Sequence, residues 1–268
     1  MTSVCFRALG PMHAEVGGDW LDLGPVRQQA VFATLLFNVD RVVTPATILQ
    51  NVWGSREPLT GTKLIPPYIY RLRRTLQPAQ GGRDAPVIET LRIGYRLRLG
   101  EARTDVADFD RAVELAAAAE SAGDLAGAAD LLAEAERSWT GEPLAGLPGP
   151  YAESRRRQLL ERRVGCLEHR LELQVRLGEC DAAIPGLMAL QREHPLRERL
   201  TILLMTALYL TGRQGEAMDV FGTARARLAA AFGVEPTRAL TDAYTALLRG
   251  ELSLAGLRPP GAGPPGPA

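Results

Sequence analysis

The amino-acid sequence predicts a mainly α-helical protein that begins with a small α+β part and continues as an all-α part. Three observations support this prediction. Residues 4–23 hold short apolar runs broken by glycines, residues 25–76 place apolar residues at helical spacing, and residues 87–97 alternate as a β-hairpin does. From residue 105 to about residue 250 the spacing is again helical. The chain has 268 residues, of which 46% are apolar, so it is long enough for two domains with cores of their own.

The first elements are short strands and a helix. Partly alternating apolar residues lie on both sides of the turn signal Gly17-Gly18 and predict strands within residues 4–23. A helix is expected from about Pro25 to Asn38, because proline suits the first turn of a helix. Its core face is predicted to consist of Val26, Ala30, Ala33, Leu36 and Phe37.

Two further helices follow, and proline marks the start of each. Thr44-Pro45 has the form of an N-cap followed by a proline at the first helical position, so a short helix is expected to run to about Trp53 and to stop at Gly54. Pro66-Pro67 lies inside the apolar pattern of the next helix. Because proline is tolerated only in a first turn, we expect the ordered helix to begin near Leu64; a longer, kinked helix is the alternative.

The third helix and the hairpin after it are both basic. The helix has one apolar stripe, which consists of Ile65, Ile69, Leu72 and Leu76. Three arginines and two tyrosines lie off this stripe. After a loop at Pro78–Pro86, the stretch Val87–Leu97 alternates and is expected to turn at Gly94. A basic amphipathic helix followed by a basic hairpin is the arrangement with which a winged helix enters the DNA major groove and touches the adjacent backbone or minor groove.

The charge of the chain is zero overall but unevenly distributed. Residues 1–100 carry 12 Lys and Arg against 7 Asp and Glu, whereas residues 101–268 carry 19 against 24. A basic front and an acidic back indicate that the front is the part that meets a polyanion. Eleven of the 12 front cations are arginines. Arginine suits bidentate contacts to phosphate and guanine, although a GC-rich genome favours arginine codons as well.

The residues expected to contact DNA lie on the third helix, on its lead-in and on the hairpin. They are Thr62, Lys63, Tyr68, Tyr70, Arg71, Arg73, Arg74, Arg92 and Arg96. Arg71 and Arg74 face away from the apolar stripe and are the candidates for reading guanine, with phosphate binding or a solvated face as the alternative. Arg73 is expected on a phosphate, and Arg92, at the wing tip, in the minor groove or on the backbone. Each tyrosine is either a donor to phosphate or a core residue, and Trp53 is expected in the core.

A weak internal repeat organises the helical part. Gly123, Gly178 and Gly212 are each followed after five residues by an alanine, after nine by a large apolar residue and after twelve by another apolar residue. The last two glycines are 34 residues apart, the period of a tetratricopeptide helix pair. A plain helical bundle with glycines at its helix ends is the alternative. The loop Thr140–Pro150 and a long helix over about Tyr151–Leu177 interrupt the period.

These patterns divide the chain into a winged-helix domain at residues 1–100, a tetratricopeptide-like domain at 104–252 and a tail at 253–268. The tail is mostly Pro, Gly and Ala, a composition that predicts disorder. No N-terminal signal sequence is recognisable and no apolar run reaches 18 residues, so we expect a soluble, cytoplasmic protein without a membrane segment.

Neither catalysis nor metal binding is predicted. Cys5, Cys166 and Cys180 are far apart and form neither a disulfide framework nor a zinc pattern, and the three histidines have no partner at ligand spacing, so surface or capping roles are expected for them. The aspartates within residues 105–110 precede a helix, where carboxylates favour the helix dipole. A charged turn at residues 197–199 is either a partner contact or, as we favour, a set of ion pairs at a helix start. Without a phosphate loop, a nucleophile elbow or an HExxH motif, we expect no enzyme activity, no cofactor and no metal.

Both halves of the chain resemble domains of a known family. The front half is similar to the OmpR/PhoB-type winged helix, through Ile69-x-Arg71-Leu72-Arg73-x-x-Leu76 for the recognition helix and Ile88-x-Thr90 with Gly94-Tyr95-Arg96-Leu97 for the wing. The back half is similar to the bacterial transcriptional activator domain, through Leu144–Leu147, the segment HPLRERL at 194–200, LYLTGRQGEA at 208–217 and Gly233-Val234-Glu235-Pro236. The two domains in this order resemble the small, two-domain form of the Streptomyces antibiotic regulatory protein family.

The resemblance implies a transcriptional activator of a gene cluster for an antibiotic or another secondary metabolite. It implies binding to direct repeats of double-stranded DNA near promoters, as a homodimer on DNA, and recruitment of the RNA polymerase holoenzyme through its sigma or alpha subunit. The protein would then be cytoplasmic and nucleoid-associated. The competing hypothesis is a protein-interaction scaffold in which the helical repeats bind partners and the front domain serves assembly. The positive charge on the third helix and the hairpin favours DNA.

Overall fold

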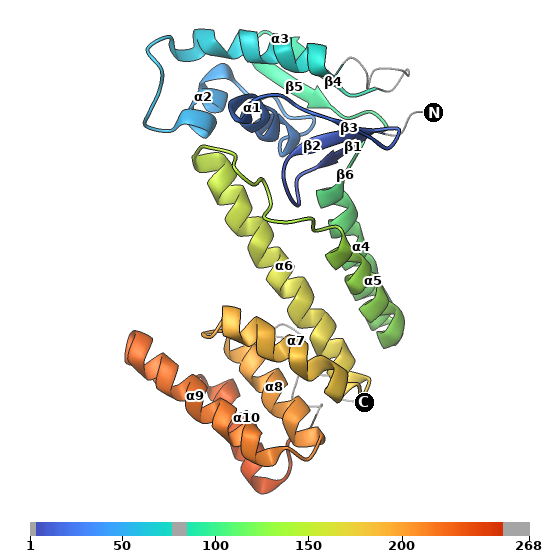
Figure 1. The fold of residues 1–268 in the computed structure, drawn as a ribbon, viewed down its shortest axis with the longest axis vertical. Coiled ribbons are helices and arrows are strands. Elements are labelled where there is room, and N and C mark those ends of the chain that lie inside the picture. Colours follow the sequence, from blue (N-terminus) through green and yellow to red (C-terminus); the bar gives the residue numbers. More distant parts are fainter. Residues whose placement is uncertain (1–3, 77–84, 254–268) are drawn as a thin grey trace, which may run out of the picture. The chain divides into compact units, whose positions relative to one another are not determined.

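The computed structural model describes residues 4–76 and 85–253 (Figure 1). Residues 254–268 of the predicted tail and 78–84 of the predicted loop lie outside the described residues. The chain packs as two compact units. Unit 1 consists of Met1–Glu114 and Glu134–Arg163, and unit 2 of Leu115–Ala133 and Val164–Ala268. The division therefore crosses the predicted boundary at residues 100–104, and the domain limits inferred from the sequence stay a prediction.

Unit 1 begins with a small sheet whose strand order is β3-β2-β1-β6. The strands β1 (Val4–Arg7), β2 (His13–Val16) and β3 (Asp19–Leu21) are antiparallel neighbours, which confirms the predicted strands. Both Gly17 and Gly18 have positive φ in the turn between β2 and β3. The two-residue strand β6 (Arg103–Thr104) pairs parallel with β1. The sequence predicted no strand there, because two residues show no periodicity.

Three helices follow in unit 1: α1 (Val26–Leu36), α2 (Pro45–Trp53) and α3 (Ile65–Thr75). Their predicted starts are confirmed. Thr44 caps α2 by accepting a hydrogen bond from the Thr47 backbone N–H at 3.1 Å, and a 3₁₀ turn, η1 (Gly61–Leu64), leads into α3 so that both prolines fall in its first turn. The α1 core face is confirmed except at Val26, which is 51% exposed.

The hairpin consists of β4 (Val87–Leu91) and β5 (Gly94–Arg98). Its turn is formed by Arg92 and Ile93, so the prediction of a turn at Gly94 is wrong by one residue. Gly94 is needed for another reason. A Cβ there would lie 2.3 Å from the carbonyl oxygen of Val43, which exchanges two backbone hydrogen bonds with Tyr95. Glycine thus allows the hairpin to lie against the backbone just before α2.

One apolar core joins these elements, and a distant segment completes it. The whole stripe of α3 is buried, as predicted, and so are Trp53 and Tyr95. The unpredicted contribution comes from the loop before α6 (Pro150–Arg176). Leu144 and Leu147 lie in the same core, and the Leu144 backbone N–H donates to the Ala8 carbonyl at 3.0 Å. The Arg156 guanidinium holds this loop by donating to three of its carbonyls, those of Pro143, Leu144 and Leu147.

The sheet is tied to the first long helix by a buried carboxylate. The helices α4 (Asp105–Ser121), α5 (Leu125–Arg137) and α6 (Pro150–Arg176) each contribute to both units. At the start of α4, Asp105 is almost fully buried and accepts hydrogen bonds from the backbone N–H groups of Ala8 and Leu9. Burial raises the pKa of this carboxyl against the opposing effect of those bonds.

Unit 2 contains α7 (Cys180–Glu193), α8 (Glu198–Leu210), α9 (Gln214–Phe232) and α10 (Arg238–Arg249) as well as parts of α4, α5 and α6. The predicted glycine repeat is confirmed as a structural repeat. Gly123, Gly178 and Gly212 all have positive φ directly after a helix. After each one, the next backbone N–H donates to a carbonyl five residues back, which closes the helix end in the same way three times.

The positions that follow each glycine are buried as the repeat requires. They are Ala128, Leu132 and Ala135 on α5, Ala183, Leu187 and Leu190 on α7, and Ala217, Phe221 and Ala224 on α9. These helices therefore pack through one small residue and two further apolar residues each. The fold is a winged helix followed by helical hairpins of tetratricopeptide type. Within the described residues, no helix is long and apolar enough to span a membrane.

One expectation about histidine is wrong. His13 was expected at the surface or as a cap, but only 5% of it is exposed. Its ring stacks on Trp20 with centroids 3.5 Å apart, and Nδ1 lies 2.9 Å from the Pro11 carbonyl oxygen. The antiparallel pairing of β2 with β3 brings the two rings together.

Candidate nucleic-acid interface

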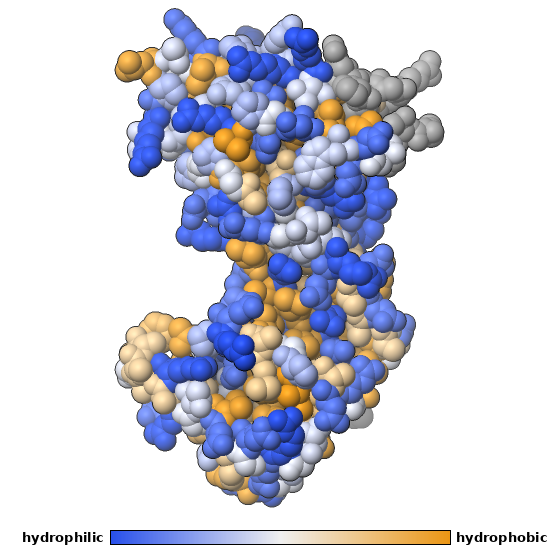
Figure 2. All heavy atoms as spheres, viewed as in Figure 1, coloured by the Kyte–Doolittle hydropathy of each residue, from blue (hydrophilic) through white to orange (hydrophobic). Residues whose placement is uncertain are grey.

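The face of α3 opposite its buried stripe is exposed and carries two arginines. Arg71 and Arg74 are exposed on it, and Tyr70 between the buried positions is 67% exposed. Thr62 and Lys63 are exposed in η1, directly before the helix. Figure 1 shows α3 and the hairpin together at the top of unit 1, and in Figure 2 hydrophilic residues (blue) predominate over this unit. Five of the predicted contact residues therefore share one continuous helical surface.

The two tyrosines of α3 have different roles. Tyr70 points outward, whereas Tyr68 is half-buried against the core and its ring lies 5.8 Å from that of Trp53. The Arg71 guanidinium carbon lies 5.9 Å from the centre of the Tyr68 ring. A guanidinium held over an aromatic face keeps its positive charge, and its side chain is partly ordered before a ligand binds. Tyr68 thus orients the arginine that is the first candidate for base reading.

Arg73 is turned toward the hairpin. Its Nε and Nη2 donate to the Ile88 carbonyl at 2.9 and 2.6 Å, and Nη2 also donates to the Thr90 hydroxyl at 2.7 Å. The phosphate contact predicted for this arginine stays a prediction. In the structure Arg73 holds strand β4 against α3, which sets the direction in which the wing projects.

The hairpin cations divide into paired and unpaired ones. Arg96 donates through Nε to Glu89 at 2.8 Å, and Arg98 lies 3.6 Å from the same carboxylate. The hydrogen bond from Arg96 lowers the pKa of Glu89. At the tip, Arg92 is exposed. Across the ranges 4–76 and 85–253, no carboxylate forms an ion pair with Arg71, Arg74, Lys63 or Arg92. Arg96 and Arg98 thus share one carboxylate, whereas the unpaired cations of η1, α3 and the tip are available to an anion.

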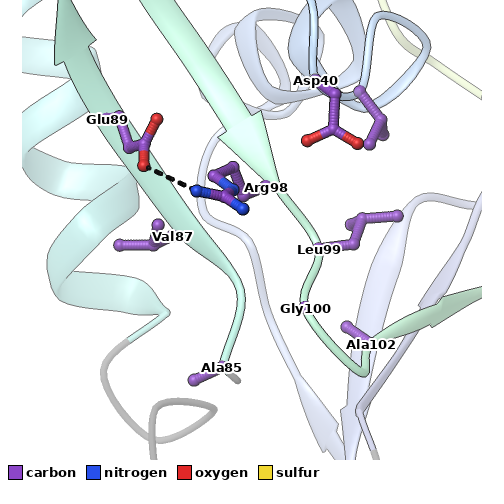
Figure 3. A pocket seen from close by; sticks show the side chains of 9 residues that line it. Asp40, Ala85, Val87, Glu89, Arg98, Leu99, Gly100 and Ala102 are labelled. Atoms are coloured by element: carbon purple, nitrogen blue, oxygen red, sulfur yellow. Dashed lines mark ion pairs between the residues drawn. The ribbon is translucent and has the colours of Figure 1, made fainter. Parts of the chain in front are cut away.

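A hollow of about 580 Å³ lies beside the base of the hairpin, as Figure 3 shows. Asp40, Glu89 and Arg98 contribute its polar groups, and Val87 and Leu99 its apolar walls. With two carboxylates and one guanidinium it is not a site for an anion. No sequence pattern predicts this hollow, because Asp40 and Arg98 are 58 residues apart. The backbone hydrogen bond from Asp40 N–H to the Leu97 carbonyl brings the two segments together.

The charged turn at residues 197–199 is used within unit 2, as favoured by the sequence. Arg199 pairs with Glu168 at 2.9 Å and with Glu172 at 2.5 Å, and Arg197 pairs with Glu168 at 3.2 Å. Glu198 accepts hydrogen bonds from the backbone N–H and the hydroxyl of Thr237, at the start of α10. The side chains of the segment HPLRERL thereby join α6, α8 and α10, so this segment has a structural role that needs no ligand.

Metal binding and cysteine chemistry find no support in the part of the chain that the structure describes. No group of three or more His, Cys, Asp or Glu side chains is placed to hold a metal ion there. Cys166 and Cys180 are buried, and burial raises the pKa of the Cys180 thiol.

Comparison with known proteins identifies both parts of the chain. Residues 104–248 match the bacterial transcriptional activator domain, and residues 23–97 match the C-terminal domain of transcriptional regulatory proteins. The chain is 40% identical to the regulatory protein AfsR of Streptomyces coelicolor over 94% of this chain and 25% of AfsR. It is 31% identical to the regulatory protein DnrI of Streptomyces peucetius over 91% of each chain. The chain thus spans about a quarter of AfsR and nearly all of DnrI.

A solved structure shares the fold over almost the whole chain. The complex of Mycobacterium tuberculosis EmbR with a low-affinity phosphopeptide superposes with a TM-score of 0.85 at 28% identity. The superposition covers 94% of this chain and 66% of the EmbR chain. The order of winged helix and helical domain is therefore common to this chain and to EmbR.

Proposed function

This chain belongs to the Streptomyces antibiotic regulatory protein family, which joins an OmpR/PhoB-type winged helix to a bacterial transcriptional activator domain, and we propose that it is a sequence-specific DNA-binding transcriptional activator. The relatives named as regulatory proteins AfsR and DnrI support a role in the control of an antibiotic or other secondary-metabolite gene cluster.

One observation carries the DNA-binding part of the proposal. Arg71 and Arg74 on α3, Lys63 in η1 and Arg92 at the wing tip are exposed and form no ion pair among the described residues, whereas Arg96 and Arg98 of the hairpin share the carboxylate of Glu89. Arginines left unpaired on a helix of a size that fits the groove present a surface for a polyanion. The buried stripe of α3 holds that surface rigid.

We infer the mechanism from this arrangement. Helix α3 enters the major groove, and we assign Arg71 and Arg74 to guanine, to which each can donate two hydrogen bonds. Thr62, Lys63 and Tyr70 contact the phosphates that border the groove and fix the register. Arg73 keeps β4 on the helix, so the tip with Arg92 reaches the neighbouring minor groove or backbone. We assign Arg96 to the hairpin itself, because Glu89 already occupies its guanidinium.

The partners are proposed on the same basis. Two copies bound to direct repeats about one helical turn apart, roughly 34 Å, would lie on one face of the duplex as a homodimer on DNA. The helical domain then presents its surface to the RNA polymerase holoenzyme. This second part rests on the family to which the chain belongs.

The test is a footprint of the full chain on the promoters that adjoin its gene, combined with a salt titration. We expect protection of two repeats one turn apart and an affinity that falls steeply with salt. The double variant Arg71→Ala/Arg74→Ala should lose the footprint, and the double variant Arg238→Ala/Arg249→Ala, which removes the same charge from exposed positions of α10, should keep it. Equal losses in both variants would contradict a specific role for α3.

A further inference from the structure

The tip of the β4–β5 hairpin presents an apolar side chain that the fold does not use. The turn consists of Arg92 and Ile93, between the paired residues Leu91 and Gly94. The Ile93 residue is 62% exposed, beside the exposed Arg92. An isoleucine gains stability by burial, so an exposed one at a turn contributes little to the free energy of folding. A polar residue would be the ordinary choice there.

The backbone of the turn does not require these two residues either. Among the described residues other than glycine, positive φ is found at Asp40 and Leu144. Neither tip residue therefore adopts the left-handed conformation that selects Asn, Asp or Gly in hairpin turns. The conformation accepts most residue types, so the pair of Arg and Ile at the tip is free to serve a contact outside the fold.

We propose that Ile93 is a specificity-determining residue that contacts the floor and walls of the minor groove and favours A·T over G·C pairs there. The inference rests on the proposed DNA-binding function. Arg73 ties β4 to α3 through Ile88 and Thr90, so the tip is carried to a fixed place when α3 lies in the major groove. Arg92 is attracted by the phosphates that border the minor groove, and Ile93 follows it in the same turn.

The chemistry of the groove decides what an isoleucine can distinguish. A·T and T·A pairs show the same acceptors in the minor groove, whereas a G·C pair adds the guanine N2 amino group, which projects into the groove as a donor. An apolar side chain packed on that amino group leaves the donor unpaired and removes it from water. The β-branched side chain has few rotamers, so its ordering on DNA costs little entropy. Ile93 therefore penalises guanine without forming a hydrogen bond.

Inosine separates the two grooves experimentally, because an I·C pair presents the major groove of G·C and the minor groove of A·T. Each base pair of the footprinted operator is replaced in turn by A·T, G·C and I·C, and the affinity of the full chain is measured. At the pairs under the wing we expect I·C to bind like A·T, and G·C to bind about tenfold more weakly. At pairs read by α3 we expect I·C to bind like G·C.

Three variants assign the preference to one side chain. Ile93→Ser should reduce the discrimination at the wing pairs to about twofold or less while the pattern at the α3 pairs is kept. Ile93→Val, which is also β-branched and apolar, should keep it. Val87→Ser, a matched change on the same hairpin at a position that is 39% exposed, should leave it unaltered.

Each other outcome overturns the proposal in a recognisable way. If I·C binds like G·C at every pair, or if Ile93→Ser keeps the full preference, Ile93 does not read the minor groove although the protein binds DNA. If the operator shows no preference at any wing pair, the inference is wrong while the proposed function stands. If the wild-type chain gives no specific footprint at all, the proposed function fails and this inference fails with it.

Discussion

At the scale of single residues, the arginines of α3 and the hairpin differ in what they bind. Arg71 is exposed beside Tyr68, Arg73 donates to Ile88 and Thr90, and Arg96 is paired with Glu89. Helical spacing put Arg71, Arg73 and Arg74 off the apolar stripe, which is confirmed. Spacing did not show that Arg73 is occupied, because its partners lie on a strand 15 residues further along the chain.

We expect Arg71→Ala to weaken binding to the operator by about 1–3 kcal/mol and to relax the preference at one base pair, because a bidentate contact to guanine is lost. A binding series with every base substituted at each position measures both effects. As a comparison, Arg92→Ala should weaken all sequences by a similar factor and reduce the slope of the salt dependence by about 1. Unchanged base discrimination in Arg71→Ala would contradict its assignment.

We expect Arg73→Gln to weaken binding to all operator variants without altering base preference, because it releases the wing and not a base contact. The matching structural readout is amide hydrogen exchange, which should become faster in β4 and β5 while α1 stays protected. Arg73→Lys should behave like Arg73→Gln, since an ammonium group cannot span Ile88 and Thr90 in the same fork geometry. A change in base preference with unchanged hydrogen exchange would show that Arg73 contacts DNA directly.

At the scale of elements, the hairpin is positioned by contacts that are not local. Its strands were predicted from alternation, and their pairing is confirmed. Its place on the core depends on the two hydrogen bonds between Val43 and Tyr95 and on the absence of a side chain at Gly94. The same holds for the loop 140–150, whose leucines fill the core of unit 1. The local sequence pattern predicted whether a segment forms a helix or a strand, but it did not predict which elements contact one another.

We expect Gly94→Ala to destabilise unit 1 by about 2 kcal/mol, because its Cβ would meet the Val43 backbone and the hairpin must move away. Urea unfolding measures the loss, and DNA affinity should fall with it. The control adds the same methyl group to a helix: Gly222→Ala in α9 meets no atom within 4 Å and should stabilise by about 0.5–1 kcal/mol. A neutral Gly94→Ala would mean that the hairpin is held elsewhere.

At the scale of the whole molecule, the acidic back of the chain is organised differently from the basic front. In unit 2, Glu168 and Glu172 on α6 are buried and are neutralised by Arg197 and Arg199. Burial, aided by the neighbouring Glu172, raises the pKa of Glu168, and Arg199 opposes the rise. These ion pairs of unit 2 join helices, whereas several cations of unit 1 are exposed and form no ion pair among the described residues.

We expect Arg199→Met to destabilise unit 2 by about 3 kcal/mol near neutral pH, because two buried carboxylates lose their main partner. Without Arg199 the pKa of Glu168 rises further above its value in the unfolded chain. The folded state then holds a proton more tightly, so stability falls as the pH rises from the unfolded pKa toward the folded one. The deficit relative to wild type should therefore shrink as the pH is lowered toward about 4.5.

Urea unfolding at neutral and acidic pH checks this prediction. Arg213→Met serves as the control, because its ion pair with Glu216 is exposed and its loss should have no measurable effect at either pH. A deficit for Arg199→Met that stays constant or grows on acidification would show that the buried carboxylates do not cause it.

The sequence by itself determined the features that depend on neighbours within a few turns or residues along the chain. The stripe of α3, the proline at the start of α2, the glycines that end helices and the small residues after them were all predicted and are confirmed. These features follow from the 3.6-residue period and from backbone φ, which are local properties.

Only the tertiary structure decided which charges are paired and which are bare. That choice depends on residues brought together from far apart along the chain, as Arg73 is with Ile88 and Arg199 with Glu168. The hydrogen bond between Leu144 and Ala8 is another contact of this long-range kind. The energy of such a contact is realised only once both backbones are in place, so no local pattern records it. For this protein the basic surface was visible in the sequence, and folding set which of its arginines stay exposed and unpaired.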